Sequence, residues 1–335
     1  MNPSSDRSLP EYRSALAPFI LNFVLEKRAT GCRYDKNAQM LKRFDRFCAE
    51  HGLGSDGLTK ETAMLWAEKT NRESDDAHSR RIRLVRMLAE YMLRLGYPAW
   101  SLPKGFVKYR ESAYQPHIFT ESELARFFER ADACAPDVKS PIRHKVLPLL
   151  FRMIYGCGLR LSEPLRLTVG DVDTAKGVLT LLETKFGKER LVPMSSSLNG
   201  RCREYMSEMH ATSPSGAVFF PSPIGGRYSE RTIYEYFRRF LREAGISHGG
   251  RGKGPRIHDL RHTFAVHCLK RWVRAGVHTA VTLPYLSAYL GHAGLKNSQR
   301  YLRLTADLHP DISSRMDEMY GALIPSPGTT TRNTP

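Results

Sequence analysis

The sequence has no long apolar run and no apolar leader. Its 335 residues contain no stretch of about 18 consecutive apolar side chains, which is roughly the length that a helix needs to cross a bilayer. The first residues, Met1 to Arg7, also lack the apolar core of a secretory signal peptide. We therefore expect a cytoplasmic protein with no membrane partner.

Closely spaced cysteines are also missing. No two cysteines have the Cys-x-x-Cys spacing that a zinc knuckle uses, and no pattern suggests a disulfide framework. The six cysteines are Cys32, Cys48, Cys134, Cys157, Cys202 and Cys268. This usage fits a reducing compartment. The sequence contains no internal repeat either.

Acidic residues are scarce relative to basic ones. The chain has 34 Asp and Glu against 51 Lys and Arg, a formal net charge of +17 at pH 7. Such an excess says little about the fold, but it favours a polyanionic partner, either nucleic acid or an anionic membrane surface. Hydrophobic residues make up 41% and charged residues 25%, which is ordinary for a folded protein long enough to form two domains.

Residues 11–96 read as an all-helical domain that follows a flexible N-terminus at 1–10. Two helices show apolar residues at the spacing of one buried face. These residues are Leu16, Phe19, Ile20, Phe23 and Val24 in the first, and Met40, Leu41, Phe44, Phe47 and Cys48 in the second. Thr59 is the predicted N-cap of a third helix, and a fourth is predicted from about Ser74 to Leu95, with Gly96 as its stop.

The fourth predicted helix has a basic shoulder next to its apolar face. Its members are Arg80, Arg81, Arg83 and Arg86. A solvated helix face explains such a cluster equally well on its own. If the second domain handles phosphate, as the motifs described below indicate, a contact with the DNA backbone becomes the better explanation for Arg80, Arg81 and Arg83.

Residues 97–117 have no periodicity and are rich in proline and basic side chains, so we interpret them as a linker in which Lys104 and Lys108 touch phosphate. The second domain is predicted to span 118–324 and to be followed by a disordered tail at 325–335. It opens with a capping box, Thr120-Glu121-Ser122-Glu123.

The second domain is predicted to be helical except for one small hairpin. A helix follows Ser140-Pro141, and helices return around 198–209 and 230–244. Short strands at 178–182 and 190–193 flank a turn that carries Lys185. On the last of these helices we expect the face with Arg238, Arg239 and Arg242 to lie near DNA. The fold class is therefore mainly α with a small β hairpin.

Four short motifs of this domain supply cations and end on a tyrosine. The residues that they contribute, in chain order, are Arg160 with Glu163, then Lys185, then His258 and Arg261 in Arg256-Ile257-His258-Asp259-Leu260-Arg261-His262, and finally His292 and Tyr301. Each motif alone is weak, but the four in this order resemble the tyrosine recombinase (phage integrase) family. The resemblance covers roughly residues 117–305 well and the first hundred residues more loosely.

The chemistry of a phosphodiester explains these residue types. Two planar guanidinium groups, at Arg160 and Arg261, can neutralise the charge that develops on the non-bridging oxygens. A tyrosine hydroxyl, with an ordinary pKa of about 10, needs a base or cationic surroundings to attack. His258 is the nearest candidate base in the sequence, and the 5′ leaving oxygen needs a proton donor.

The resemblance assigns the remaining roles. It implies that Lys185 protonates the leaving oxygen, that His292 hydrogen-bonds the scissile phosphate, and that Glu163 braces the site. It also implies an N-terminal core-binding domain, a 3′-phosphotyrosyl intermediate at Tyr301, no cofactor and no metal. The partners would be double-stranded DNA, a homo-tetramer on that DNA and accessory recombination proteins. The task would be the integration or excision of a mobile element.

Several alternatives stay open at this point. His258 and His262, four residues apart, could bind zinc on one helix face, although Arg261 between them would repel a dication and no third ligand is evident. A type IB topoisomerase uses similar chemistry as a monomer, and a DNA-binding regulator could keep the fold without the reaction. Taken singly, His262 and Ser162 are most simply structural.

Three features depart from the family pattern. Phe186 stands where a glycine is common, which would make the Lys185 turn less open. Pro164 directly follows Glu163, which is acceptable only in the first turn of a helix. The stretch 273–289 is longer than in compact members of the family, so its local architecture is the least predictable part of the domain.

Overall fold

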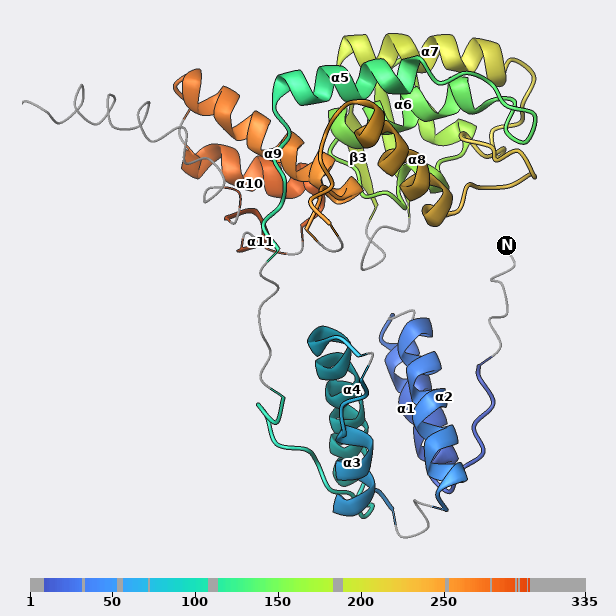
Figure 1. Ribbon diagram of the computed structural model, residues 1–335, viewed down its shortest axis with the longest axis vertical. Helices are drawn as coiled ribbons and strands as arrows, with labels where there is room; N and C mark the ends of the chain where they lie inside the picture. Colours follow the sequence, from blue (N-terminus) through green and yellow to red (C-terminus); the bar gives the residue numbers. More distant parts are fainter. Residues whose placement is uncertain are drawn as a thin grey trace, which may run out of the picture. The chain divides into compact units, whose positions relative to one another are not determined.

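The computed structural model describes residues 9–31, 34–52, 57–71, 73–107, 114–182, 189–250, 253–277, 279–292, 294, 296–299 and 301. Contacts within the chain divide it into two compact units, Met1–Ala113 and Tyr114–Pro335 (Figure 1). Lys108, Lys185, Phe186 and the tail expected at 325–335 lie outside the described residues.

The described residues of the first unit form four helices: α1 (Ala17–Ala29), α2 (Asp35–Glu50), α3 (Lys60–Ala67) and α4 (Asp75–Arg94). The predicted Thr59 cap is confirmed, because its side chain accepts the amide of Thr62. Ser74, where the fourth helix was expected to begin, caps α4 by accepting the amide of Ala77. Gly96, with a φ of 79°, follows the end of α4. The helices enclose a core of Leu16, Ile20, Phe23, Leu41, Phe44, Leu88 and other apolar side chains.

The residues that follow α4 still pack against the first unit. The Trp100 amide donates to the Leu58 carbonyl at 2.6 Å, and the Leu102 side chain is buried. The segment predicted as a linker is therefore held against the first unit at its start. Lys104, a little further along, is exposed.

The second unit is helical around one small sheet, as predicted for the fold class. Its helices are α5 (Glu121–Asp132), α6 (Arg143–Gly156), α7 (Ser196–Met209), α8 (Glu230–Glu243), α9 (Ile257–Arg274), α10 (Thr279–Leu290) and α11 (Lys296–Gln299). The short 3-10 helices η1 (Pro164–Arg166) and η2 (Val169–Asp171) follow α6. The stretch 273–289 proves to be the end of α9 and most of α10.

The sheet is a three-stranded antiparallel meander in the order β1 (Val172–Asp173), β2 (Val178–Leu181) and β3 (Arg190–Pro193). The pairing of β2 with β3 starts from Val178 opposite Pro193 and ends at Leu181 opposite Arg190. Because side chains alternate along a strand, Arg190 lies on the same face as the fully buried Val192. A charged side chain on that face requires a partner inside the protein.

Two apolar clusters fix the frame around α9. Phe127, Phe151, Phe237 and Phe240 pack ring against ring between α5, α6 and α8, where truncating one of them to alanine costs about 3–5 kcal/mol. A smaller cluster joins α9 and α10 and takes in Tyr301. Helix α9 thus lies between the main core and the C-terminal tyrosine. Within the described part of the chain, no helix is both long and apolar enough to cross a membrane.

Candidate active site

A buried carboxylate, Glu163, is the centre of the cationic site. It precedes the first residue of η1, and only 7% of its side chain is exposed. Arg160, in the turn after α6, donates its amide to Glu163 Oε2 at 2.8 Å and its Nη1 to Oε1 at 2.7 Å. Arg190 donates Nη1 to Oε1 at 3.0 Å and Nη2 to Oε2 at 2.9 Å. One carboxylate therefore orients two guanidinium groups from distant segments.

Arg261 brings a third guanidinium group from the first turns of α9. Its side chain is 1% exposed, and Nη1 lies 4.0 Å from Glu163 Oε2. It donates to the Gly158 carbonyl at 2.7 Å and to the Leu290 carbonyl at 2.6 Å. The ends of α6 and α10 are thus tied to α9 through this one side chain.

Two glycines leave room for neighbouring side chains at the site, Gly291 for Arg190 and Gly158 for Phe264. Gly291, with a φ of +64°, lies so close to Arg190 that an added Cβ would sit 2.7 Å from Nη1. Its carbonyl accepts the Nη2 of Arg160 at 3.0 Å. Gly158, with a φ of +58°, would place a Cβ 2.5 Å from the Phe264 ring. Both positions need a left-handed backbone and no side chain.

The electrostatics follow from this crowding. Burial on its own would raise the pKa of Glu163, but hydrogen bonds and charge from Arg190 and Arg160 outweigh it and lower the pKa below the ordinary 4.5. Burial, followed by repulsion from Arg160, lowers the pKa of Arg261 to about 10. The carboxylate is therefore ionised and the guanidinium charged at neutral pH. The excess of positive charge suits an anion.

His292 lies directly beside this positive cluster. Its Nδ1 is 2.7 Å from Ser298 Oγ, and its amide donates to the Ser287 carbonyl at 3.0 Å. Burial, followed by the charges of Arg261 and Arg160, lowers the pKa of His292 to about 4. The ring is therefore neutral at pH 7 and can donate or accept a hydrogen bond without adding charge.

Tyr301 is fully buried, with 1% of its surface exposed. Its hydroxyl lies 3.2 Å from Nδ1 of His262, and its ring is stacked on the His292 ring with centroids 6.0 Å apart. The hydroxyl is also close enough to Arg261 to influence that guanidinium. His258, the base expected from the sequence, is exposed on α9, and its ring contacts the His262 ring edge to face at 4.5 Å.

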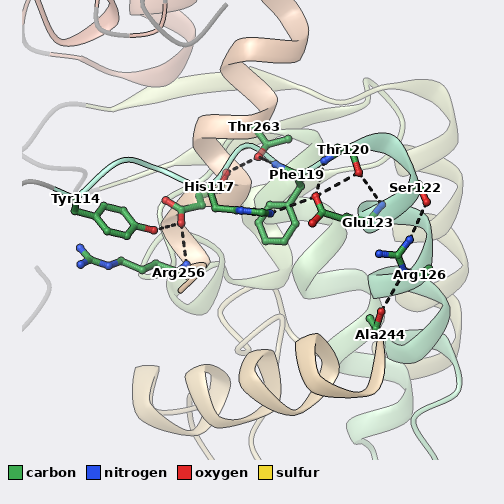
Figure 2. Close-up of polar contacts among 11 residues, drawn as sticks. Tyr114, His117, Phe119, Thr120, Ser122, Glu123, Arg126, Ala244, Arg256 and Thr263 are labelled. Atoms are coloured by element: carbon green, nitrogen blue, oxygen red, sulfur yellow. Dashed lines mark hydrogen bonds and ion pairs between the residues drawn. The ribbon is translucent and has the colours of Figure 1, made fainter. Parts of the chain in front are cut away.

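The start of α9 is anchored by the segment that opens the second unit. Figure 2 shows Tyr114 beside Arg256, whose guanidinium carbon lies 3.5 Å from the centroid of the tyrosine ring. The Tyr114 hydroxyl donates to the carboxylate of Asp259, which also accepts the Arg256 amide at 2.8 Å. Burial raises the pKa of Asp259 above its ordinary value. These contacts fix the first turn of the helix that carries His258, Arg261 and His262.

The structure brings together Arg160, Glu163, Arg261, His292 and Tyr301 from the predicted set, and it keeps His258 at the edge of this group. Lys185 lies outside the described residues, although β3 enters the site at Arg190 immediately after that segment. The Pro164 departure is accommodated, because Pro164 is the first residue of η1.

The residues predicted to contact the DNA backbone differ in their surroundings. Arg80 and Arg83 are exposed on α4. Arg81 is 7% exposed, and its guanidinium binds Glu73 and the carbonyls of Trp66 and Glu68. That geometry gives Arg81 a structural role inside the unit. On α8, Arg242 is exposed and Arg238 is half-buried, while Arg239 pairs with Glu243 at 2.7 Å.

Two residues of the site were missed by sequence reasoning. Arg190 was predicted only as the start of a strand. The signal that could have indicated its role is its position on the same face of β3 as the buried Val192. His262 was taken as structural, because its role depends on the position of Tyr301. Among the described residues, no group of three His, Cys, Asp or Glu side chains could hold a metal ion.

Comparisons with known proteins find similar sequences over most of the chain. The model of the phage integrase family matches residues 117–307. The y4rB protein of Sinorhizobium fredii, described by its name as an integrase/recombinase, is 30% identical over 311 residues, which cover 90% of this chain and 96% of that protein. The tyrosine recombinase XerA of Pyrococcus furiosus is 30% identical over 57% of this chain and 58% of its own.

Solved structures share the fold at low sequence identity. The integrase of transposon Tn1549, in complex with circular intermediate DNA, superposes with a TM-score of 0.59 at 17% identity and covers 84% of this chain and 94% of its own. The XerH site-specific recombinase, bound to its difH substrate after cleavage, gives 0.58 at 20% identity, with 79% and 74% covered.

Proposed function

Because the chain belongs to the phage integrase family of tyrosine-type site-specific recombinases, we propose that it cuts and rejoins double-stranded DNA through a 3′-phosphotyrosyl bond at Tyr301. One observation carries this proposal. Arg160 and Arg261, which come from distant segments, meet at the carboxylate of Glu163, and the Tyr301 hydroxyl lies close enough to Arg261 to interact with its charge. That arrangement suits a phosphodiester.

The residues divide the work of the cleavage step. Arg160 and Arg261 hold the non-bridging oxygens, and Glu163 with Arg190 keeps Arg160 in place. His292, neutral at pH 7, donates a hydrogen bond to the phosphate. The Tyr301 oxygen attacks phosphorus as the bond to the 5′-oxygen breaks, so the DNA is left with a 3′-phosphotyrosyl end and a 5′-hydroxyl. A 5′-hydroxyl from another strand then reverses the step.

Lys185 is proposed to give the leaving 5′-oxygen its proton. The support is the motif and the two strands that flank the segment carrying it. The flanking strands are paired up to Leu181 opposite Arg190, and Arg190 contacts the central carboxylate. A lysine near two or more arginines has a lowered pKa, which suits a proton donor.

The relatives support a proposal for the wider role. The Tn1549 integrase and XerH are described in complexes with DNA, and y4rB carries the name integrase/recombinase. We propose integration or excision of a mobile element by a homo-tetramer on DNA, aided by accessory proteins. Exposed arginines such as Arg83 and Arg242 would bind backbone phosphates.

Covalent capture tests the proposal. The protein would first select its site from a pool of random-sequence duplexes by repeated binding. The selected duplex is then nicked next to the scissile phosphate, so that cleavage releases a short fragment that carries the 5′-hydroxyl. Because this fragment diffuses away, it cannot reverse the reaction, and the covalent adduct is trapped. We call this nicked duplex the capture substrate. A protein that binds the selected duplex tightly but never forms an adduct that survives denaturation is a DNA-binding regulator instead.

A further inference from the structure

The tyrosine hydroxyl and His262 face each other inside the protein. His262 Nδ1 lies 3.2 Å from the Tyr301 oxygen, and the two residues are 5% and 1% exposed. We propose that His262, and not His258, takes the proton from Tyr301 during cleavage and returns it during rejoining. The inference rests on the proposed function, because it assigns a further catalytic residue to the same reaction.

The position of His262 on α9 supports this role. It directly follows Arg261, so the helix delivers the guanidinium that holds the phosphate and the imidazole that contacts the nucleophile as neighbours. The Tyr301 ring is held on its other side by the stacked His292 ring and packs in the cluster with Val266 and Leu286. The phenol ring is therefore held in place, with its oxygen 3.2 Å from the Nδ1 of His262.

Burial makes a protein base necessary. A hydroxyl with 1% of its residue exposed has little access to solvent water, so its proton needs an acceptor within the protein. Among side chains, a neutral imidazole is the common acceptor near neutral pH. His258 is exposed on the same helix, edge-on to His262, and can face bound DNA instead.

The proton balance is simple. With its proton on Nε2, His262 accepts the phenolic proton at Nδ1 as the oxygen of Tyr301 forms its bond to phosphorus and the bond to the 5′-oxygen breaks. An imidazole with an ordinary pKa of about 6.5 is a weaker base than phenolate, so the transfer has to accompany attack rather than precede it. The charge of Arg261 close to the hydroxyl favours the phenolate that develops. In rejoining, the imidazolium returns the proton to the departing phenolate.

A plain packing role is the competing explanation, and chemical rescue separates the two. His262→Phe keeps a flat ring against Tyr301 but removes the acceptor, and His262→Gln keeps a hydrogen bond without a basic site. Replacing Tyr301 with 3-fluorotyrosine lowers the phenol pKa, so the nucleophile depends less on a base. Fluorotyrosine should therefore restore part of the cleavage rate if the His262 variants have lost a base. It should not restore the rate if they have lost only packing.

The experiment measures single-turnover adduct formation on the capture substrate, after thermal unfolding and DNA affinity have shown which variants fold. We expect each His262 variant to be slower by at least about a hundredfold, the scale of general base catalysis. Fluorotyrosine at position 301 should recover about tenfold or more in either His262 variant and less than about threefold in Arg160→Ala, because an arginine that binds non-bridging oxygens does not act on the phenol proton.

Rates within severalfold of wild type in both His262 variants, or equal fluorotyrosine gains in the His262 and Arg160 variants, would overturn the assignment. If His262→Gln folds and His262→Phe does not, the rate of adduct formation in His262→Gln and its recovery with fluorotyrosine decide the assignment. Absence of any adduct with the wild-type protein would instead count against the proposed function, which keeps the two failures distinct.

Discussion

Glu163 and Arg190 form a two-pronged ion pair across 27 residues of sequence, with Oε1 and Oε2 each accepting one guanidinium nitrogen, at 3.0 and 2.9 Å. The pair links the turn after α6 to the first residue of β3. The same carboxylate holds Arg160, so the geometry of the arginine that is proposed to bind phosphate depends on a strand to which the sequence patterns assign no catalytic role.

The first prediction concerns this carboxylate. Glu163→Gln should lower the free energy of unfolding by roughly 3–5 kcal/mol at pH 7, because it leaves buried guanidinium groups without their anion. The folded-state pKa of Glu163 is lowered below 4.5, so the stabilisation is present above pH 4.5 and is lost as the pH falls below that value. Denaturant unfolding at pH 7 and pH 3.5 should show the difference between wild type and variant shrinking in acid.

Glu235 offers a matched control for that experiment, since it pairs with Arg231 on the surface with 62% of its side chain exposed. Glu235→Gln should change stability by less than about 1 kcal/mol at either pH. A Glu163→Gln gap that stayed constant down to pH 3.5 would mean that the carboxylate is not specifically stabilised in its ionised form.

The second prediction separates the two arginines that are proposed to bind phosphate, Arg160 and Arg261. Arg160→Ala and Arg261→Ala should each slow adduct formation by at least about a hundredfold, the scale for removing one donor to a developing oxyanion. Arg261→Ala should also lower stability, because the carbonyls of Gly158 and Leu290 lose a buried donor, at about 1–3 kcal/mol each. Arg160→Ala should lower stability less than Arg261→Ala, because 23% of the Arg160 side chain is exposed.

Arg130→Ala, which alters an exposed residue of α5, is the control. It should leave both the rate of adduct formation and the stability nearly unchanged. Adduct formation within severalfold of wild type in Arg160→Ala or Arg261→Ala would remove that arginine from the phosphate site.

The third prediction concerns His292, whose pKa is lowered to about 4 by burial and then by the charges of Arg261 and Arg160. NMR titration of the imidazole proton should show a neutral ring down to about pH 5, with the signal assigned by its loss in His292→Gln. Because the folded-state pKa lies below the ordinary 6.5, the stability linked to the neutral ring is present above pH 6.5 and is lost as the pH falls toward 4.

Arg160→Ala should shift the midpoint of this titration upward, because it removes one of the nearby positive charges. Arg271→Ala, which alters an exposed residue at the far end of α9, should not shift it. A His292 midpoint near 6.5 in the wild-type protein would show that the ring is not in the cationic, buried setting described above.

The fourth prediction uses two neighbouring arginines of α4. Arg83 is exposed and should bind phosphate, so Arg83→Ala should make the log–log dependence of DNA affinity on salt shallower by about 0.9. Arg81, buried against Glu73 and two carbonyls, should instead lower the stability of the first unit when replaced by alanine. If the folded Arg81→Ala protein showed the shallower slope and Arg83→Ala did not, the two roles would be reversed.

Local patterns were enough to predict most of the fold. Thr59, Ser74 and the Thr120-to-Glu123 box mark helix starts through contacts within one turn, and these contacts are visible in the sequence. The two strands around Lys185 follow from a short run of β-favouring residues. The burial of Arg81 did not follow, because Glu73 and the Trp66 carbonyl approach it only after α3 and α4 have packed.

The site was predictable where a motif carried the signal and not where tertiary packing did. Arg160, Arg261 and Tyr301 belong to motifs whose order is informative. Arg190 reaches Glu163 only because β3 pairs with β2 and because Gly291 leaves room for its side chain. His262 acquires its contact only when the chain after α11 brings Tyr301 against α9. Such long-range contacts have no local signature.

The central claim is that Tyr301 becomes covalently linked to DNA, and the most direct test is to locate that link. The capture substrate would be incubated with wild-type protein and with Tyr301→Phe, and the adduct would be digested and sequenced by mass spectrometry. We predict a nucleotide attached through a 3′-phosphate to the peptide that contains Tyr301, and no adduct with Tyr301→Phe, which should still bind the same DNA because the hydroxyl adds little to ground-state affinity. An adduct on a different residue, or one that persists in Tyr301→Phe, would contradict the account.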